Sequence, residues 1–184
     1  MITMLSISPV CPYDSIGHAG GKTFNYYLKK ISQKDCIQIK VLFFGNNEEI
    51  NKCDLAEYKI SFDSILTSGK LNTDIEHFFW DILGRLFFKI PRQQKFSLFK
   101  LKKIIEHLKR LKKSDALPEI VELEWTDFVY YAKYIKQKYP QIKLIASEHD
   151  VTYLGLERKG LSAKKLARAK KQELEALHNC DVVM

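Results

Sequence analysis

Strand-like and helix-like patterns alternate along nearly the whole of the 184-residue chain. Short apolar runs, several of them rich in β-branched and aromatic residues, predict strands at Ile2–Ile7, Ile37–Phe44, Glu57–Phe62, Pro118–Trp125, Lys143–Ser147 and Cys180–Met184. Apolar residues at helical spacing predict helices at Lys22–Lys34, Asp74–Phe88, Phe96–Lys113, Asp127–Tyr139 and Leu161–His178. This order favours a doubly wound α/β fold, in which helices cover both faces of a mainly parallel sheet.

The length and composition agree with one such domain spanning residues 1–184. With 46% hydrophobic and 28% charged residues, and without low-complexity segments or internal repeats, the chain is expected to be globular. In doubly wound sheets, ligands bind at the carboxyl ends of the strands, near the point where the strand order reverses. Residues that follow the predicted strands are therefore the first candidates for a functional site.

A pair of glycines, Gly20 and Gly21, follows the first predicted strand and precedes Lys22 and Thr23. Gly-Lys-Thr resembles the phosphate loop of nucleotide hydrolases, but that loop requires four residues between its first glycine and the Gly-Lys-Thr. Only three residues follow Gly17 before Gly21, which disfavours a hydrolase. A strand, a glycine turn and a helix N-terminus still present N–H groups and a positive dipole end to a phosphate. The alternative is that the glycines only allow close packing of helix and strand.

Acidic and imidazole side chains end two further predicted strands. Glu122 and Glu124 share one side of the strand PEIVELEW, where a glutamate is costly unless it is paired or lies at the open end of the sheet. His149 follows the strand KLIAS, and Asp150 beside it could fix the tautomer of the imidazole. Because imidazole both donates and accepts hydrogen bonds near neutral pH, His149 is the stronger candidate for chemistry. A purely structural histidine is the alternative.

The positive charge is unevenly distributed. Between residues 95 and 113 the chain has eight Lys and Arg residues against one Glu, a net charge of +7 in a chain whose total is +8. A second basic stretch runs from Lys164 to Lys171. Such segments favour polyanionic partners, whether nucleic acid, an anionic membrane or a phosphorylated substrate. Leucines and isoleucines line the other side of the helix predicted at Phe96–Lys113, which could therefore lie on anionic lipid or pack on the sheet.

The spacing of the cysteines and the hydropathy indicate in which cellular compartment the protein is expected. Cys11, Cys36, Cys53 and Cys180 are scattered, with no pair spaced as in a zinc site or a redox motif, so we expect reduced thiols in a cytoplasmic protein. No secretory signal precedes the first strand. The most apolar run, Phe78–Ile90, is interrupted by charged residues, and no segment is expected to span a bilayer.

The motifs together resemble the N-terminal half of a GT-B glycosyltransferase. The resemblance rests on the N-terminal strand, the Gly-Gly turn that leads into a helix, the PEIVELEW strand, the strand ending in EHDV, and the long helix before DVV. They are most similar to the large retaining family that includes sucrose, mannosyl and lipopolysaccharide-type transferases. The resemblance covers nearly the whole chain. It implies a hexosyltransferase whose N-terminal domain mainly holds the acceptor, whose C-terminal domain binds a nucleotide-sugar, and whose cleft between the two performs the transfer.

The resemblance also implies roles for individual residues. Gly20 and Gly21 match the glycine loop that approaches the donor diphosphate and sugar, whereas Lys22 and Thr23 only begin a helix. His149 matches the histidine at the strand tip beside the transferring sugar, which makes it the expected catalytic residue.

Three further positions are implied to line the cleft. Glu124 stands where many members carry a histidine or glutamate at the preceding strand tip, and Asp150 and Arg158 match polar residues that often follow the histidine. The family's C-terminal carboxylates and basic pair do not occur in this sequence, which stops within a predicted strand. We therefore expect the donor-binding domain to lie outside these 184 residues, and the chain alone to be inactive.

The resemblance implies no metal and no cofactor, with a nucleotide-sugar as the donor substrate. The acceptor would be a glycan or a lipid-linked molecule, as in polysaccharide biosynthesis, and the location cytoplasmic, extending to a peripheral position at the inner membrane face. Two other functions stay open. A basic nucleic-acid-binding α/β module is disfavoured because the aromatic residues lie mostly in apolar-face positions and no recognition motif occurs. A nucleotide hydrolase is disfavoured by the loop spacing.

Overall fold

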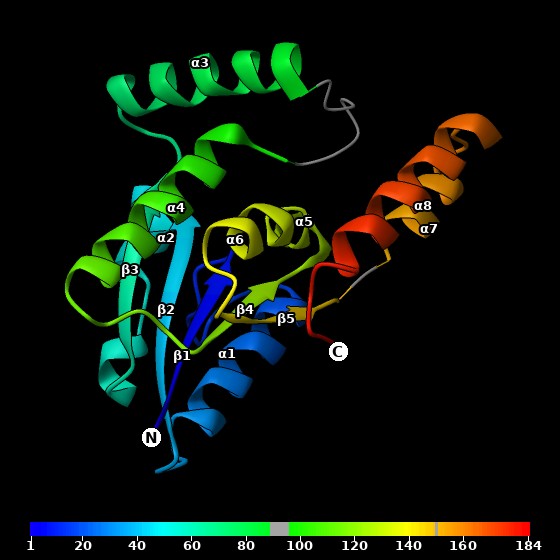
Figure 1. The fold of residues 1–184 in the computed structure, drawn as a ribbon. Helices are drawn as coiled ribbons and strands as arrows, with labels where there is room; N and C mark the ends of the chain where they lie inside the picture. Colours follow the sequence, from blue (N-terminus) through cyan, green and yellow to red (C-terminus); the bar gives the residue numbers. More distant parts are fainter. Residues whose placement is uncertain (89–95, 150) are drawn as a thin grey trace.

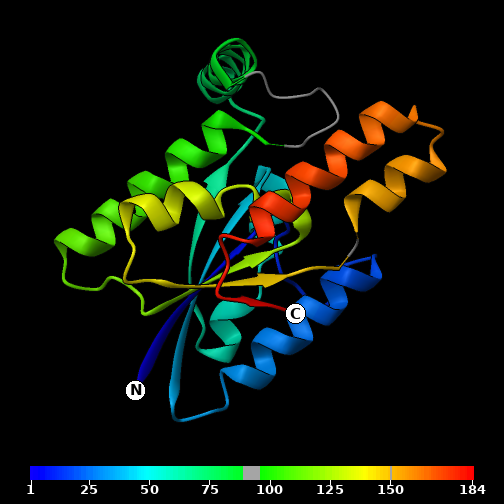
Figure 2. The same ribbon diagram turned by 45° about the vertical axis from the view of Figure 1, so that its right-hand side comes forward.

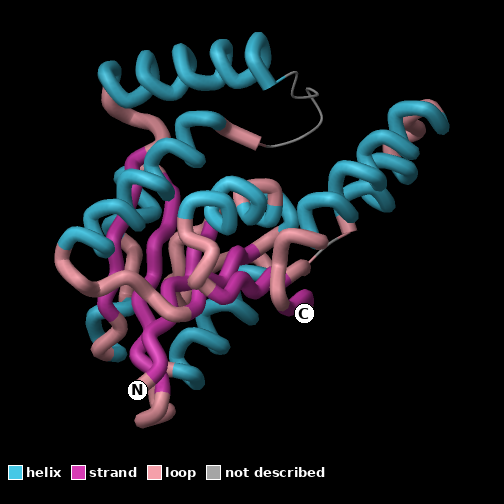
Figure 3. The backbone as a smooth tube through the Cα atoms, viewed as in Figure 1, coloured by secondary structure: helices cyan, strands magenta, loops and turns pink. Residues whose placement is uncertain are grey.

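In the computed structural model, which describes residues 1–88, 96–149 and 151–184, six strands form one sheet (Figures 1 and 3). The strands are β1 (Ile2–Ser8), β2 (Ile37–Gly45), β3 (Ser61–Leu66), β4 (Ile120–Glu124), β5 (Lys143–Ser147) and β6 (Val182–Val183). All neighbouring strands are parallel, in the order β3-β2-β1-β4-β5-β6. This is the strand order of a Rossmann-like fold, and it confirms the predicted doubly wound architecture.

Helices cover both faces of the sheet. They are α1 (Ala19–Ile31), α2 (Asn47–Asn51), the 3₁₀ turn η1 (Leu55–Tyr58), α3 (Leu71–Phe88), α4 (Leu98–Lys113), α5 (Thr126–Val129), α6 (Ala132–Lys138), α7 (Thr152–Arg158) and α8 (Ala163–Leu177). One buried cluster joins the sheet to α1, and another joins it to α4, α5 and α6 on the opposite face (Figure 2). The helices α7 and α8 form a pair that projects from the sheet beyond β5 (Figures 1 and 2).

The interior strand β2 shows why these segments were recognisable in the sequence. Ile39, Val41 and Phe43 enter the cluster on the α1 side, and Leu42 and Phe44 enter the cluster on the α4 side. A parallel strand covered on both faces has no polar side, so its sequence becomes a continuous apolar run.

Several boundaries differ from those predicted. Helix α1 begins at Ala19 and not at Lys22, because the Nδ1 atom of His18 accepts the N–H of Gly21 at 3.0 Å and so caps the helix. Strand β3 lies later than predicted, since Leu55–Tyr58 forms the turn η1. The aromatic-rich segment after β4 forms two short helices in place of one, and α7 precedes the long helix α8.

The two amphipathic helices α3 and α4 are placed differently. In α4, Leu101, Ile104 and Leu108 are at most 7% exposed and belong to the cluster on the sheet, so the apolar stripe of the predicted basic helix packs on the sheet. Helix α3 lies beyond α4, away from the sheet (Figures 1 and 2). No helix in the described ranges combines the length and apolar character needed to cross a membrane.

Candidate functional site

The structure brings four residues together at the carboxyl edge of β1, β4 and β5. Glu124 is the last residue of β4, Trp125 follows it, His149 lies just after β5, and Gly20 lies in the first turn of α1 after β1. Strand order reverses between β1 and β4, so this group, called the edge cluster below, occupies the position at which doubly wound sheets bind ligands.

A hydrogen bond and a ring stack fix the orientation of His149. Its Nε2 atom lies 2.9 Å from Oε2 of Glu124, whose side chain is 1% exposed, while the His149 side chain is 21% exposed. The indole of Trp125 stacks on the imidazole with ring centroids 4.3 Å apart and an interplanar angle of 29°. A carboxylate therefore fixes one ring nitrogen of a histidine that is still partly accessible to solvent.

Trp125 has a strained backbone. Its φ of 65° and ψ of 145° lie in a region that bulky L-residues rarely adopt. The N–H of Trp125 still donates to the carbonyl of Ser147 at 2.9 Å, so the strain begins directly after the last sheet hydrogen bond. This conformation places the indole between His149 and α1, where it also meets His18 edge to face at 6.4 Å. Strain of this kind is concentrated at functional sites.

The two glycines of α1 have different neighbours. A Cβ atom added to Gly20 would lie 3.2 Å from Cζ2 of Trp125, so Gly20 allows the indole to approach the start of the helix. A Cβ atom added to Gly21 would overlap Cδ1 of Ile16 and lie 2.7 Å from Cε1 of His18. Gly21 therefore allows the loop before α1 to close on its own helix, whereas Gly20 belongs to the edge cluster.

Glu124 of the edge cluster and a second buried carboxyl group, Glu122, lie on the α1 side of β4. Glu122 and Glu124 are 0% and 1% exposed, and burial raises the pKa of both. The charge of Glu124 raises the pKa of Glu122 further. Among the described residues neither oxygen of Glu122 has a partner at hydrogen-bond distance, although the hydroxyls of Ser6 and Tyr27 oppose the rise from longer range. Burial thus favours the neutral form of Glu122 beside the Glu124–His149 pair.

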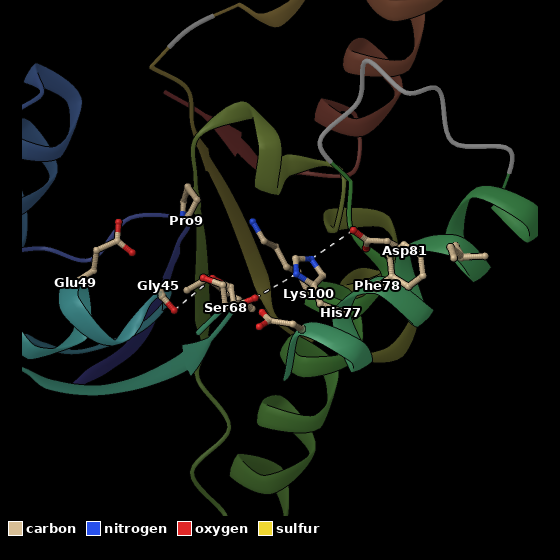
Figure 4. A pocket seen from close by; sticks show the side chains of 12 residues that line it. Pro9, Gly45, Glu49, Ser68, His77, Phe78, Asp81 and Lys100 are labelled. Atoms are coloured by element: carbon tan, nitrogen blue, oxygen red, sulfur yellow. Dashed lines mark hydrogen bonds and ion pairs between the residues drawn. The ribbon is translucent and has the colours of Figure 1, made fainter. Parts of the chain in front are cut away.

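A pocket of about 560 Å³ opens on the other side of the same edge, beyond β1, β2 and β3 (Figure 4). Its lining residues are Pro9, Phe44, Gly45, Glu49, Thr67, Ser68, Asp74, His77, Phe78, Asp81, Ile82 and Lys100. Carboxylates, an imidazole and an ammonium group alternate with two phenylalanine rings, a mixture that suits a polyhydroxylated ligand.

Hydrogen bonds and an ion pair hold the polar side chains of α3 that face the pocket. His77 lies 3.3 Å from the carbonyl of Thr67 through Nδ1 and 3.4 Å from Asp81 through Nε2. Ser97, the N-cap of α4, donates its hydroxyl to Asp81 at 2.7 Å. Since a carbonyl oxygen only accepts, Nδ1 of His77 carries the proton in this arrangement.

Two predicted site residues remain, Arg158 and Asp150. Arg158 is an exposed residue at the end of α7, one of the two helices that project beyond β5 (Figures 1 and 2). Asp150 lies outside the described residues. Within the described ranges, no group of three His, Cys, Asp or Glu residues is arranged to hold a metal ion.

Trp125 and the pocket have only weak signals in the amino-acid sequence. Trp125 stands at the tip of PEIVELEW, but its positive φ could not be inferred because such angles are typical of glycine and asparagine. His77 and Asp81 are polar positions four residues apart in a predicted amphipathic helix, and they read as a solvated face. Only their contact with Ser97 shows that they face the protein.

Comparison with known proteins supports the fold. The chain is similar to the N-terminal domain of Candida albicans trehalose-6-phosphate phosphatase, with a TM-score of 0.55 and 12% identity over 98% of this chain and 39% of that chain. A match to O-ureido-L-serine synthase has a TM-score of only 0.24, with 10% identity over 80% of this chain and 44% of that chain. No protein-family model and no curated protein matches. At this identity the comparison shows a Rossmann-like α/β domain and no specific activity.

Proposed function

We propose that this chain is the acceptor-side half of a retaining GT-B glycosyltransferase, which transfers a sugar from a nucleotide-sugar to an acceptor hydroxyl. The observation that carries the proposal is the edge cluster. Residues that the family resemblance singles out, from three separate stretches of sequence, meet around one strained tryptophan at the reversal point of the sheet.

The N-terminus of α1 is suited to the departing diphosphate. In sugar transfer the bond from the anomeric carbon to the diphosphate oxygen breaks, and negative charge develops on that oxygen. Since the N–H of Gly21 donates to His18, the helix dipole and the N–H groups before Gly21 would stabilise such a charge. Gly20 leaves the approach to these groups without a side chain, apart from the indole of Trp125.

His149 is suited to contact the transferring sugar. Its ring is held by Glu124 and by Trp125, so it would lose little conformational freedom when a sugar hydroxyl binds. A positioned hydrogen-bonding group that acts mainly in the transition state contributes about 10²-fold or more to a rate. Glu124 acts through His149 and is therefore a positioning residue.

The pocket under α3 is suited to the acceptor. It lies on the same edge as the cluster, and the Lys100 ammonium, which lines it, lies 5.3 Å from the ring centre of Phe128 in α5, the short helix that follows Trp125. Carboxylates of Glu49, Asp74 and Asp81 would accept hydrogen bonds from acceptor hydroxyls, and Phe78 would pack against an apolar sugar face.

The alternative functions gain less support. A phosphate loop would have to wrap around its ligand, but His18 caps α1 and Lys22 is an exposed residue within its first turn. A nucleic-acid-binding module would need aromatic platforms on a basic face. Phe99 of the basic helix α4 is buried, and the exposed rings of Phe78 and Phe79 lie on α3 instead.

Sugar transfer by the complete protein that contains this chain tests the proposal. UDP-glucose, UDP-N-acetylglucosamine, GDP-mannose and ADP-glucose, each labelled in the sugar, are suitable donors. We expect transfer from at least one donor and a loss of about 10²-fold in turnover for His149→Ala, with folding retained. His178→Ala, at the exposed end of α8, is the matched control and should keep wild-type activity. Unchanged transfer by folded His149→Ala, or ATP or GTP hydrolysis without sugar transfer, would contradict the proposal.

A further inference from the structure

Two thiols that are far apart in the sequence lie together on the α1 side of the sheet. Cys11, in the loop between β1 and α1, is 1% exposed and belongs to the buried cluster that joins the sheet to α1. Cys53, which follows α2, is partly buried and packs against the same cluster. Both are free cysteines, and their thiol groups interact with each other. These two residues are called the thiol pair below.

Hydrogen bonds hold the two segments side by side at the thiol pair. The Cys11 thiol donates to the carbonyl of Glu49 in α2 at 3.1 Å. The N–H of Asp14 donates at 2.7 Å to the carboxylate of Asp54, the residue that follows Cys53. A disulfide requires a specific approach of the two side chains, and segments that are already joined on either side of the thiols need less backbone movement to reach it.

The other two cysteines are placed where they cannot join this pair. Cys36 is exposed and comes directly before β2, at the amino edge of the sheet, whereas Cys11 follows the carboxyl end of the parallel strand β1. Cys180 packs against the cluster on the α4 side of the sheet, and burial raises the pKa of its thiol to about 11. Only the tertiary structure thus distinguishes one pair among four scattered cysteines.

The two thiols of the pair differ in access and in acidity. The Cys11 thiol stabilises a thiolate at Cys53 by a hydrogen bond, and a backbone hydrogen bond at Leu55 adds to this, so the pKa of Cys53 is lowered. The interaction with Cys53 and burial raise the pKa of Cys11. Because the thiolate is the nucleophile, the less buried Cys53 is suited to react first with a small oxidant, and Cys11 to react second.

We propose that Cys11 and Cys53 form a reversible redox site, which hydrogen peroxide converts to a disulfide. The Cys53 thiolate attacks one oxygen of the peroxide, the O–O bond breaks, and a sulfenic acid and hydroxide form. The Cys11 sulfur then attacks the Cys53 sulfur and displaces its hydroxyl group as hydroxide. The protons released by the two thiols convert both hydroxides to water. The two sulfur atoms together lose the two electrons that the peroxide oxygens gain.

The disulfide would join two walls of the pocket covalently. Pro9, two positions before Cys11, and Glu49 both line the pocket. In the reduced protein the hydrogen bond from the Cys11 thiol to the Glu49 carbonyl connects these two segments. Reversible disulfides of this kind also occur in reducing compartments, where they serve redox sensing. The site goes beyond the proposed sugar transfer and does not depend on it.

Peroxide treatment of the 184-residue chain, followed by mass spectrometry, tests this inference. The reduced, folded chain is treated with a small excess of hydrogen peroxide, which catalase then removes. The remaining thiols are alkylated in concentrated urea, and the alkylated cysteines and cross-linked peptides are identified. The control carries Cys36→Ser and Cys180→Ser, which leave the thiol pair intact. The variant Cys11→Ser keeps a hydroxyl group that can donate to the Glu49 carbonyl, so its fold should be retained.

We expect wild type and control each to lose two thiols and to give one peptide pair linked through Cys11 and Cys53, which dithiothreitol separates. The oxidised chain should melt roughly 5–10 °C higher, because the bond constrains the unfolded chain. Cys11→Ser should instead accumulate a sulfenic acid at Cys53 that dimedone traps. Retention of all four thiols by wild type, or a linkage through Cys36 or Cys180, would overturn the inference. Oxidation confined to the exposed Cys36 would overturn it as well.

Discussion

The two sides of the carboxyl edge of the sheet bury opposite kinds of groups. At the edge cluster, carboxyl groups are enclosed, and the chain itself covers Glu122 and Glu124 almost completely. On the α3 side, polar groups form the contact between helices and apolar side chains face outward. The first arrangement encloses its polar groups within the fold, whereas the second leaves apolar side chains of α3 exposed.

The pKa values of the carboxyl groups on the two sides are shifted in opposite directions. Burial raises the pKa of Glu122 and Glu124, whereas hydrogen bonds from Lys102 and Lys103 lower the pKa of Glu76. The two sides should therefore respond to pH with opposite sign. A carboxyl group with a raised pKa destabilises the fold when the pH rises, and one with a lowered pKa destabilises it when the pH falls.

The largest expected effect is at Glu122. The folded state holds the Glu122 proton more tightly than the unfolded state, so stability is full below the unfolded pKa and is lost as the pH rises through the folded pKa. Glu122→Gln should remove this loss and be more stable than wild type by about 2 kcal/mol at mildly alkaline pH, with little difference at pH 5. Urea unfolding at both pH values measures it, with exposed Glu175→Gln as the control. If the unfolding free energies of wild type and Glu122→Gln changed equally between the two pH values, Glu122 would not be buried as a neutral group.

The next effect separates the two glycines. Gly21→Ala must displace buried Ile16 and the His18 cap, so it should cost about 1–2 kcal/mol in unfolding free energy even after the gain in helix propensity. Gly20→Ala meets only the edge of Trp125 and should stay within about 0.5 kcal/mol of wild type while reducing sugar transfer. Thermal unfolding of both variants checks this. An equal loss of unfolding free energy at the two positions would contradict the view that Gly21 serves loop closure and Gly20 the edge cluster.

A smaller effect of opposite pH sign is expected at Glu76. Its pKa is lowered mainly by Lys102, so its contribution is present at neutral pH and is lost as the pH falls through the folded pKa. Because the pair is about one-third exposed, Glu76→Gln should cost only about 0.5–1 kcal/mol at pH 7 and nothing at pH 3. Unfolding measurements beside exposed Glu57→Gln test this. A cost that persists at pH 3 would point to packing instead of charge.

The smallest effect on stability is expected on the outer stripe of α3, its exposed apolar residues Leu71, Ile75, Phe78, Phe79, Ile82 and Leu86. Phe79→Ser should change the unfolding free energy by no more than about 0.5 kcal/mol, since the side chain is 55% exposed and the two residues have similar helix propensity. Tyr26→Ser on α1 is the matched control. A cost of several kcal/mol for Phe79→Ser would mean that the stripe is covered within the folded chain, which would erase the contrast between the two sides.

Local periodicity made the fold and part of the site predictable. The alternation of apolar runs with helical spacing was sufficient for a parallel sheet, and parallel strands bring their carboxyl ends to one edge. Gly20, Glu124 and His149 could therefore be expected at the same edge before any coordinates, and the structure places them there. Their roles in catalysis stay predictions.

Other contacts depend on segments far apart in the sequence. The scattered thiols of Cys11 and Cys53 become neighbours on the α1 side of the sheet. The stack of Trp125 on His149 needs a backbone angle that residue type disfavours. The sum of the surrounding packing imposes that angle, and no local pattern encodes it.

By itself the sequence determined the order of most strands and helices, though not all of their bounds, because the spacing of apolar side chains is a local property of the chain. It determined also that α3 and α4 each have an apolar side. Only the tertiary structure decided what each side contacts: α4 presents its stripe to the sheet, while Glu76 and Asp81 bind α4 and turn the stripe of α3 outward. The physical reason is that amphipathicity creates a surface to be covered, whereas the partner that covers it is chosen by contacts between elements.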